Sequence, residues 1–261
     1  MASYLIVGAS RGIGLAFVKQ LSANQQNQAF AGVRNVESSI HLRPLLSRPN
    51  VHAIKLDMTD VISLKAAAEE VARINNGKLD VMIINAGLTD SGKLFKDYTY
   101  EEIIEEHSMF TNNVLGPVLT MKAFLPLVSQ GSQKKIIAIS SANADSEFTL
   151  TVESGMGATY TATKAALNAY ITKFSVQYCQ EGIIFRSICP GMVDVGATRD
   201  PPVLDQSRYE SMMKKLKPLF PDFKGPLTPE QSVDMILEVI DKTTMADSGT
   251  FVSHNGNKEW L

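Results

Sequence analysis

The sequence predicts an α/β fold, with one doubly wound parallel sheet flanked by helices, and two patterns carry this prediction. Short apolar or β-branched runs recur along the chain, and longer amphipathic or alanine-rich stretches separate them. Continuous apolar runs indicate strands that are buried on both faces, as parallel sheets require. Strict alternation of strand and helix then implies right-handed βαβ crossovers within a single sheet.

The elements follow one another in a regular order. Strands are predicted at 4–7, 28–33, 51–57, 80–85, 134–140, 183–190 and 250–253, and helices near 12–24, 60–75, 99–128, 159–180 and 228–242. No linker rich in proline, glycine or serine divides the chain, so we expect residues 1–261 to form a single domain. The stretch 196–227 contains five prolines and interrupts the alternation. We expect it to be a substrate-binding loop or lid.

Composition excludes several classes of protein. The 261 residues are 44% hydrophobic and 20% charged, as in a soluble globular protein. A net charge of −2 gives no indication of nucleic acid or an anionic membrane as partner. No apolar run approaches the ~20 residues of a membrane span. Cys179 and Cys189 lack metal-ligand spacing and fit a reducing compartment, and the N-terminus leads directly into a predicted strand. We therefore expect a cytoplasmic protein without a metal site.

The first predicted turn has the features of a phosphate-binding loop. "VGASRGIG" (7–14) follows the first strand and opens the first helix, with glycines at positions 8, 12 and 14. Glycine lets the backbone approach a pyrophosphate closely, and a helix N-terminus supplies free N–H groups and a positive dipole. An ordinary strand-to-helix turn is the alternative. The position after an N-terminal buried strand favours a Rossmann-type dinucleotide site.

The charge at the end of the second strand indicates which dinucleotide binds. An NAD site presents a carboxylate there to the ribose 2′-hydroxyl, whereas an NADP site presents a cation to the 2′-phosphate. Here the strand ends with Arg34, and Arg11 lies inside the glycine loop, while Glu37 comes too late. Because a guanidinium can bind phosphate in bidentate fashion, the sequence favours NADP(H).

Further short motifs follow the glycine loop in an order typical of one enzyme family. They are "LDMTD" with Asp57, "NAG" (85–87), "NNVLG" with Asn113, "ISSA" with Ser141, "YTATK" with Tyr160 and Lys164, and "PG" (190–191). On these motifs the chain resembles the short-chain dehydrogenase/reductase family over nearly its whole length. The stretch "TKAALNAYITKFSVQY" and the ending "GTFVSHNGNKEWL" resemble the branch of C-factor-like and sniffer-like carbonyl reductases.

The resemblance implies two sets of site residues. The catalytic set is Asn113, Ser141, Tyr160 and Lys164, and the cofactor-binding set is Gly8, Ser10, Arg11, Gly12, Ile13, Gly14, Arg34, Asp57, Met58, Asn85, Ala86, Gly87, Tyr160, Lys164, Pro190, Gly191 and Val193. In the family the residue at Asp57 bonds the adenine amino group.

Two positions and one spacing depart from the family pattern. Ile84 stands where a polar asparagine is common, and Val195 stands where a threonine commonly contacts the nicotinamide amide. One cofactor hydrogen bond is therefore expected to be lost at residue 195, although backbone groups near Val193 could still hold the amide. The separation of 19 positions between Ser141 and Tyr160 is longer than usual, and we expect the extra residues within 142–158 to form a loop at the rim of the substrate cleft.

The spacing of Tyr160 and Lys164 suits proton transfer. A tyrosine with a pKa of about 10 is a poor partner at neutral pH. A lysine one helical turn away favours the phenolate and lowers that pKa. Tyr160 is then the acid in reduction and the base in oxidation. The resemblance further implies that Lys164 binds the nicotinamide ribose, that Asn113 holds a water, and that Ser141, with Ser140 as the alternative, donates to the substrate carbonyl.

The sequence thus predicts an NADPH-dependent oxidoreductase that reduces a ketone or aldehyde to an alcohol. An apolar pocket is favoured by six lid residues, although residues at helical spacing are more often ordinary packing. They are Met212, Met213, Leu216, Leu219, Phe220 and Phe223. Two alternatives remain: a ketoreductase, dehydratase or cyclase of a specific secondary-metabolic pathway, and a non-catalytic NADP-binding regulatory protein. The small residues around Tyr160, and the resemblance, lead us to expect a homodimer or homotetramer.

Overall fold

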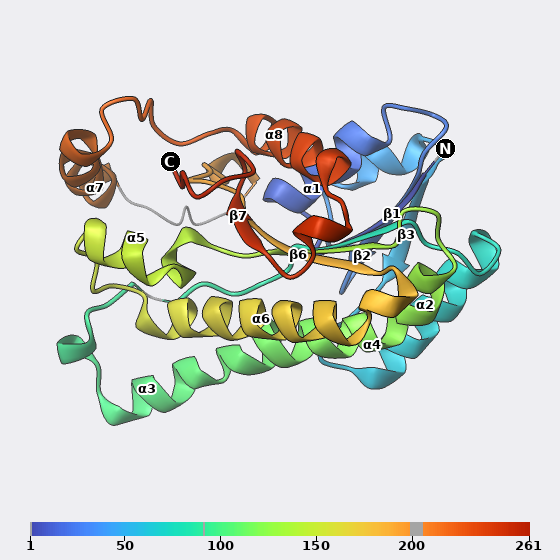
Figure 1. The fold of residues 1–261 in the computed structure, drawn as a ribbon, viewed down its shortest axis with the longest axis horizontal. Coiled ribbons are helices and arrows are strands. Elements are labelled where there is room, and N and C mark those ends of the chain that lie inside the picture. Colours follow the sequence, from blue (N-terminus) through green and yellow to red (C-terminus); the bar gives the residue numbers. More distant parts are fainter. Residues whose placement is uncertain (1, 91, 199–205) are drawn as a thin grey trace.

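The computed structural model describes residues 2–90, 92–198 and 206–261, and in them seven strands form one parallel sheet (Figure 1). The strands are β1 (Ser3–Val7), β2 (Gln28–Val33), β3 (Val51–Lys55), β4 (Val81–Ile84), β5 (Lys135–Ile139), β6 (Ile184–Cys189) and β7 (Phe251–Ser253). Their order is β3-β2-β1-β4-β5-β6-β7, and every pairing is parallel. The predicted fold class is confirmed. The order reverses between β1 and β4, where a crevice opens at the carboxyl ends of the strands.

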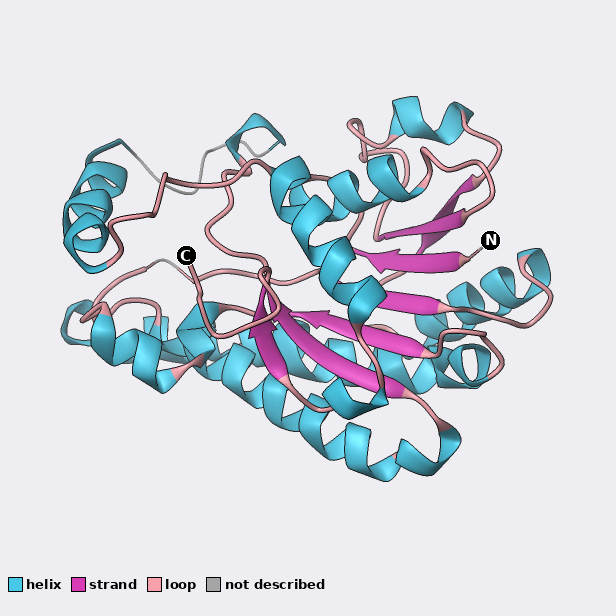
Figure 2. Ribbon diagram, turned by 45° about the horizontal axis from the view of Figure 1, so that its top comes forward, coloured by secondary structure: helices cyan, strands magenta, loops and turns pink. Residues whose placement is uncertain are grey.

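Helices cover both faces of the sheet. One face carries α1 (Gly12–Leu21) and α8 (Pro229–Lys242), and the other carries α2 (Val61–Ile74), α4 (Gly116–Ser129) and α6 (Ala158–Gln177) (Figures 1 and 2). Successive residues of β1 point to opposite faces, so Ile6 joins the cluster under α1 and α8 while Leu5 joins the cluster against α4 and α6. This burial on both faces explains the continuous apolar runs.

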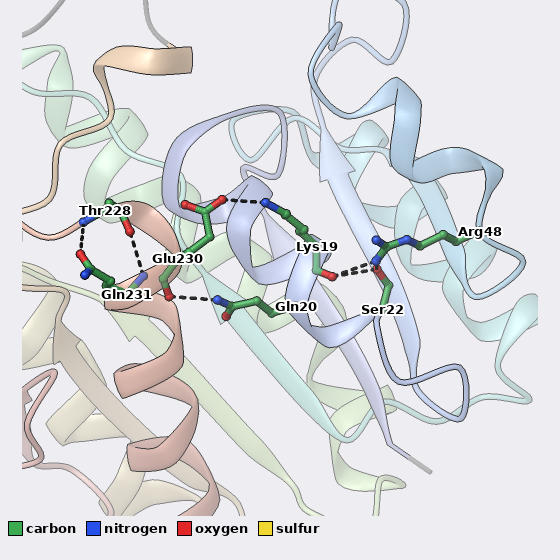
Figure 3. Close-up of polar contacts among 7 residues, drawn as sticks. All are labelled: Lys19, Gln20, Ser22, Arg48, Thr228, Glu230 and Gln231. Carbon is green, nitrogen blue, oxygen red and sulfur yellow. Dashed lines mark hydrogen bonds and ion pairs between the residues drawn. The ribbon is translucent and has the colours of Figure 1, made fainter.

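The pairing of α1 with α8 fixes the helix that follows the glycine loop (Figure 3). The ammonium of Lys19 lies 2.9 Å from the carboxylate of Glu230, and the Gln20 amide donates to the Glu230 carbonyl at 2.9 Å. Thr228 and Gln231 form a capping box that begins α8. The start of α8, and with it the end of the lid segment, is therefore attached directly to α1.

Two predictions about local structure are wrong. The predicted helix 99–128 is divided into α3 (Tyr100–His107), a π-helical turn over Thr111–Leu115, and α4. The segment 142–158, expected as a loop, contains the short helix α5 (Ser146–Thr151). Asp145 begins α5 by accepting the Phe148 N–H, and Phe148 then packs into an apolar cluster with Leu216 and Trp260. Capping and this distant packing make the segment helical.

The segment 196–227 leaves the sheet and returns to the same place. The backbone N–H of Asp194 donates to the Leu227 carbonyl at 2.9 Å, and the Leu227 N–H donates to the Met192 carbonyl at 2.8 Å. Between these points lies α7 (Gln206–Leu219), which extends beyond the carboxyl ends of the strands together with α3 and α5 (Figure 1). Residues 199–205 of the expected lid lie outside the described residues.

The apolar lid candidates divide into two groups. Leu216 is buried, and Phe220 and Phe223 are partly buried against the same cluster as Phe148. Leu219 is exposed, Met213 is half-buried, and the side chain of Met212 lies outside the description. Three of the six side chains, Leu216, Phe220 and Phe223, therefore take part in packing within the described structure.

Candidate active site and cofactor cleft

The glycine loop is shaped by close backbone contacts. Gly8 has a φ of +87°, and a β-carbon there would lie 2.7 Å from the β-carbon of Ala86. A β-carbon at Gly14 would lie 2.0 Å from the Gly8 carbonyl oxygen. Neither position can accept a side chain without moving backbone, so the loop folds back tightly onto the end of β4. The Asn85 amide supports this turn by donating to the Gly8 carbonyl at 3.1 Å.

The N-terminus of α1 faces the cleft, and its own N-cap residue supplies no side-chain cap, although the Thr198 hydroxyl accepts the Gly12 N–H at 2.9 Å from outside the helix. Arg11 occupies the capping position in an extended conformation, and its side chain makes no capping hydrogen bond. The first turn contains no acidic residue. Because uncapped N–H groups and the helix dipole both favour an anion, this end of α1 fits a pyrophosphate.

The cleft brings together most of the predicted cofactor-binding residues. Eleven of them line it, namely Gly8, Ser10, Arg11, Gly12, Ile13, Arg34, Asp57, Met58, Asn85, Ala86 and Gly87. The motifs that supply them each follow the end of a parallel strand, which explains their convergence. Leu88, Asn112, Val195 and Thr198 also line the cleft and were not predicted to bind cofactor.

The other predicted cofactor residues lie outside this cleft. Gly14 is packed behind the glycine loop. The Pro190 carbonyl accepts the Ser232 hydroxyl at 2.7 Å, and Val193 pairs with Leu227 in an isolated bridge. Gly191 has a φ of +79°, and a β-carbon there would lie 2.8 Å from the imidazole of His254. Pro190, Gly191 and Val193 lie at the start of the segment that leads to α7.

A second cavity adjoins the cleft at its basic end. Ser10, Arg11, Arg34 and Thr198 line both cavities, and Asn35, Ser38 and His41 extend the second one. Glu37 lines neither cavity. Two guanidinium groups and a serine hydroxyl therefore surround a space that fits a phosphate better than an unmodified ribose.

Asp57 lies at the floor of the cleft as a carboxylate. The backbone N–H of Thr59 donates to it at 2.9 Å and the Thr59 hydroxyl at 2.7 Å. These bonds hold the pKa of Asp57 below its ordinary value, with a smaller contribution from Arg34. Asp57 is thus kept ionised, and an ionised carboxylate can only accept hydrogen bonds, which suits a contact with the adenine amino group.

Tyr160 is half-buried at the start of α6, and its environment differs from the expected one. Burial raises the pKa of Tyr160 to about 12, and a hydrogen bond with Ser141 opposes this in part. The ammonium of Lys164 lies 5.8 Å from the centre of the phenol ring. The expected lowering of this pKa by Lys164 is therefore not found, because desolvation of the phenolate is the largest effect on it. Tyr160 is held in its protonated form.

Lys164 lies deeper on the same helix face. Its ammonium donates to the Ile139 carbonyl at 2.8 Å, and burial lowers the pKa of Lys164 to about 8. The nearby Cys189 thiol is also buried, which raises the pKa of Cys189 to about 11. Lys164 is thus the cation closest to Tyr160 on α6, and its charge is sensitive to mildly alkaline pH.

Asn113 is positioned by the π-helical turn that the sequence did not predict. Its side chain is 1% exposed and pairs with the backbone of Leu88, accepting the N–H at 2.7 Å and donating to the carbonyl at 2.8 Å. A β-carbon built on Gly87 would lie 3.3 Å from Asn113 Oδ1 and 3.5 Å from Lys164 Nζ. Gly87 therefore allows Asn113 and Lys164 to approach the same point. A π-turn at such a place is typical of functional sites.

Ser141 and Ser140 differ clearly in their surroundings. Ser141 follows β5, accepts the Asn143 N–H at 3.3 Å and interacts with Tyr160. Ser140 is 2% exposed, and its hydroxyl is buried without a hydrogen-bond partner among the described residues. The geometry favours Ser141 over Ser140 as the partner of Tyr160.

Asp90 joins the site although sequence reasoning did not identify it. One carboxylate oxygen accepts the backbone N–H of Tyr160 at 3.1 Å, and the other accepts the Gly92 N–H at 3.0 Å. Asp90 thus caps α6 from a distant loop, in place of Gly157, whose position offers no side chain. The sequence feature that could have identified Asp90 is an acidic residue shortly after "NAG".

The described residues contain neither a candidate metal site nor a candidate membrane span. Among the described residues, no three His, Cys, Asp or Glu side chains gather in a way that could hold a metal ion. None of the described helices is both long and apolar enough to cross a membrane.

The parallel sheet, and the helix N-terminus that faces the cleft at its switch point, define an α/β protein of the dinucleotide-binding class. Sequence comparison identifies the family within this class. A sequence model described as short chain dehydrogenase matches residues 3–202, so the chain belongs to the short-chain dehydrogenase/reductase family of oxidoreductases. The predicted resemblance is confirmed.

Relatives and solved structures agree over nearly the whole chain. The short-chain dehydrogenase/reductase atnB of an Arthrinium species is 40% identical over 100% of both chains, and the uncharacterized oxidoreductase C663.06c of Schizosaccharomyces pombe is 34% identical over 97% of this chain and 95% of its own. An NADPH-bound carbonyl reductase from chicken fatty liver is 29% identical, covers 98% of each chain and superposes with a TM-score of 0.80. This structure supports placement in the carbonyl reductase-like branch.

Proposed function

We propose that the protein is an NADPH-dependent carbonyl reductase that converts a ketone or aldehyde to an alcohol. The carrying observation is a protonated Tyr160, in contact with Ser141 and close to Lys164, beside a cleft that is lined by the start of α1 and two arginines. Similarity to the NADPH-bound chicken carbonyl reductase supports the choice of reaction and of cofactor.

The residues divide the work of reduction between them. NADPH, when bound, supplies the hydride to the carbonyl carbon. Ser141 donates a hydrogen bond to the carbonyl oxygen, and this bond strengthens as negative charge develops there. Tyr160 delivers its proton to that oxygen, so the product is the neutral alcohol. The ammonium of Lys164 stabilises the phenolate that remains on Tyr160.

The cofactor is held by the chain's own charges and backbone. The N-terminus of α1 receives the pyrophosphate, Asp57 accepts from the adenine amino group, and Arg11 and Arg34 bind the 2′-phosphate. The protein is proposed to work in the cytoplasm, with a small carbonyl compound as substrate and without metal, nucleic acid or membrane.

Replacement of Tyr160 by phenylalanine tests this function. We expect Tyr160→Phe to lower kcat for reduction of reactive carbonyls by a factor of about 10² to 10⁴, because the proton donor is lost. NADPH affinity should be retained, since no cofactor contact in the glycine loop changes. The measurement is NADPH oxidation at 340 nm, combined with titration calorimetry of NADPH.

Tyr170→Phe is the matched control, because Tyr170 lies on the same helix with 42% of its surface exposed. Tyr160→Phe turnover equal to that of the control would contradict the catalytic assignment. Wild-type protein that binds NADPH but oxidises none across a broad carbonyl panel would indicate a regulatory protein. Products whose mass equals that of the substrate would indicate a cyclase.

A further inference from the structure

Thr198 makes a contact with the phosphate loop that was not predicted from the sequence. Its hydroxyl oxygen accepts the backbone N–H of Gly12 at 2.9 Å, across 186 positions of the chain. Gly12 is the first residue of α1, so this N–H belongs to the group of donors that a helix N-terminus offers to a phosphate. Thr198 also lines both the cofactor cleft and the adjoining basic cavity.

The position of Thr198 is fixed by bonds outside α1. It ends a short turn over Gly196–Thr198, in which the Gly196 N–H donates to the Asp194 carboxylate at 2.8 Å. Asp194 is in turn held by the Leu227 carbonyl. Val195 packs against Gly12, where a β-carbon would lie 3.2 Å from its Cγ1. The backbone of the turn therefore places Thr198 beside the phosphate loop.

The hydroxyl hydrogen of Thr198 is available for a stronger acceptor. Its bond to the Val195 carbonyl is long, at 3.4 Å. A hydroxyl whose oxygen already accepts a hydrogen bond is polarised and becomes a better donor. A phosphate oxygen bound at the N-terminus of α1 would lie beside this hydroxyl and would accept a charge-assisted bond.

We infer that Thr198 is a cofactor-positioning residue, whose hydroxyl donates to a pyrophosphate oxygen while its oxygen holds the Gly12 N–H. The inference rests on the proposed dinucleotide-dependent function. The Thr198 contact offsets the one expected to be lost at Val195. Thr198 stands three positions after Val195, and its hydroxyl is proposed to contact the phosphates instead of the nicotinamide amide. Arg34 then selects the 2′-phosphate, whereas Thr198 acts on the pyrophosphate common to both dinucleotides.

Two ligands separate these roles. NADPH carries both the pyrophosphate and the 2′-phosphate, whereas adenosine 2′-monophosphate carries only the latter. Affinities for both would be measured by titration calorimetry on wild type, Thr198→Val, Thr198→Ser and Arg34→Ala. Thr172→Val is the control for hydroxyl loss. Thr172 lies on α6, its hydroxyl donates to the Gly249 carbonyl, and it lines neither cavity.

We expect Thr198→Val to bind NADPH about ten-fold more weakly, the effect of one charge-assisted hydrogen bond, and to bind adenosine 2′-monophosphate as wild type does. Thr198→Ser should retain NADPH affinity. Arg34→Ala should weaken both ligands and reduce the preference for NADPH over NADH.

Three results would overturn the role of Thr198: unchanged NADPH affinity in Thr198→Val, equal weakening of both ligands, or failure of the serine variant to retain binding. The second would mean that Thr198 only caps α1. A wild-type protein that prefers NADH would contradict the proposed cofactor alone, and weaker NADH binding by Thr198→Val would still support the role of Thr198, because NADH carries the same pyrophosphate. A wild-type protein that binds neither dinucleotide would contradict both proposals.

Discussion

Tyr160 and Lys164 have opposite shifts of pKa for the same reason. Burial disfavours the charged form of each side chain, so the pKa of Tyr160 rises to about 12 and that of Lys164 falls to about 8. At neutral pH the pair is therefore a neutral phenol beside an ammonium. This is the charge state that a proton donor for carbonyl reduction needs.

The lowered pKa of Lys164 predicts a pH limit for reduction. As pH rises through about 8, Lys164 loses its proton while Tyr160 keeps its own, so the phenolate formed by proton donation loses its stabilising cation. We expect kcat for reduction to fall above that pH by about ten-fold per unit, as for a single titrating group. The measurement is a pH–rate profile at saturating NADPH and carbonyl substrate.

Lys164→Arg is the informative variant, because a guanidinium remains charged over the whole range. Its rate should be lower at every pH, since the geometry changes, but without a decline near pH 8. A wild-type profile that stays level to pH 10 would show that the charge of Lys164 is not needed for turnover.

Some residues of the site could be predicted from the sequence, and others could not. The residue type and order of Ser141, Tyr160 and Lys164 were sufficient to propose that they meet, because each follows a recognisable motif. Asp90 and Thr198 were missed, because each acts through one bond to a backbone N–H distant in sequence. Such bonds depend on loop paths, which composition and periodicity do not encode.

At the scale of elements, strands were predicted more accurately than the connections near the site. Strands such as β1 are buried along their whole length, so their apolar runs are plain in the sequence. The division of helix 99–128 depends on Asn113 pairing with Leu88, and the helical form of α5 depends on Phe148 packing against Trp260. Both causes are tertiary, and tertiary contacts override local propensity.

The C-terminal tail holds α5 against the rest of the molecule. The ring of Trp260 lies 4.7 Å from that of Phe251 and 6.5 Å from that of Phe148, centre to centre. Lys258 stands over the Trp260 ring and pairs with Asp145 at the start of α5. The tail thus sets the position of α5, which contacts the turn that follows Ser141.

Replacement of Trp260 by alanine should both destabilise the protein and disturb substrate binding. Trp260 is 6% exposed, so its loss should lower the free energy of unfolding by about 3 to 5 kcal/mol. We also expect a higher KM for the carbonyl substrate with unchanged NADPH affinity, since the glycine loop is distant in the fold. Urea unfolding and steady-state kinetics measure the two effects.

Lys258→Ala is the comparison for the same tail. Its side chain is 62% exposed, so the ion pair with Asp145 should contribute less than about 1 kcal/mol. Equal stability of the two variants would mean that the tail is held by charge and not by the aromatic cluster.

At the scale of the whole molecule, one long surface remains uncovered along α6. Ala162, Ala165, Ala169 and Val176 recur at helical spacing on this helix, and all are exposed, Val176 at 70%. Side chains at this spacing share a helix face, and small ones let another helix approach closely. We propose that two copies of the chain associate through this face, as a homodimer or as part of a homotetramer.

A charged residue in the middle of this face should separate the subunits. Light scattering after gel filtration is expected to give a dimer or tetramer for the wild type and a monomer for Ala169→Arg, because a buried guanidinium without a partner opposes association. Ala66→Arg, on the exposed side of α2, should keep the wild-type mass. An Ala169→Arg variant of wild-type mass would exclude this face of α6. Because the same helix carries Tyr160 and Lys164, loss of the partner should also reduce turnover more than NADPH affinity.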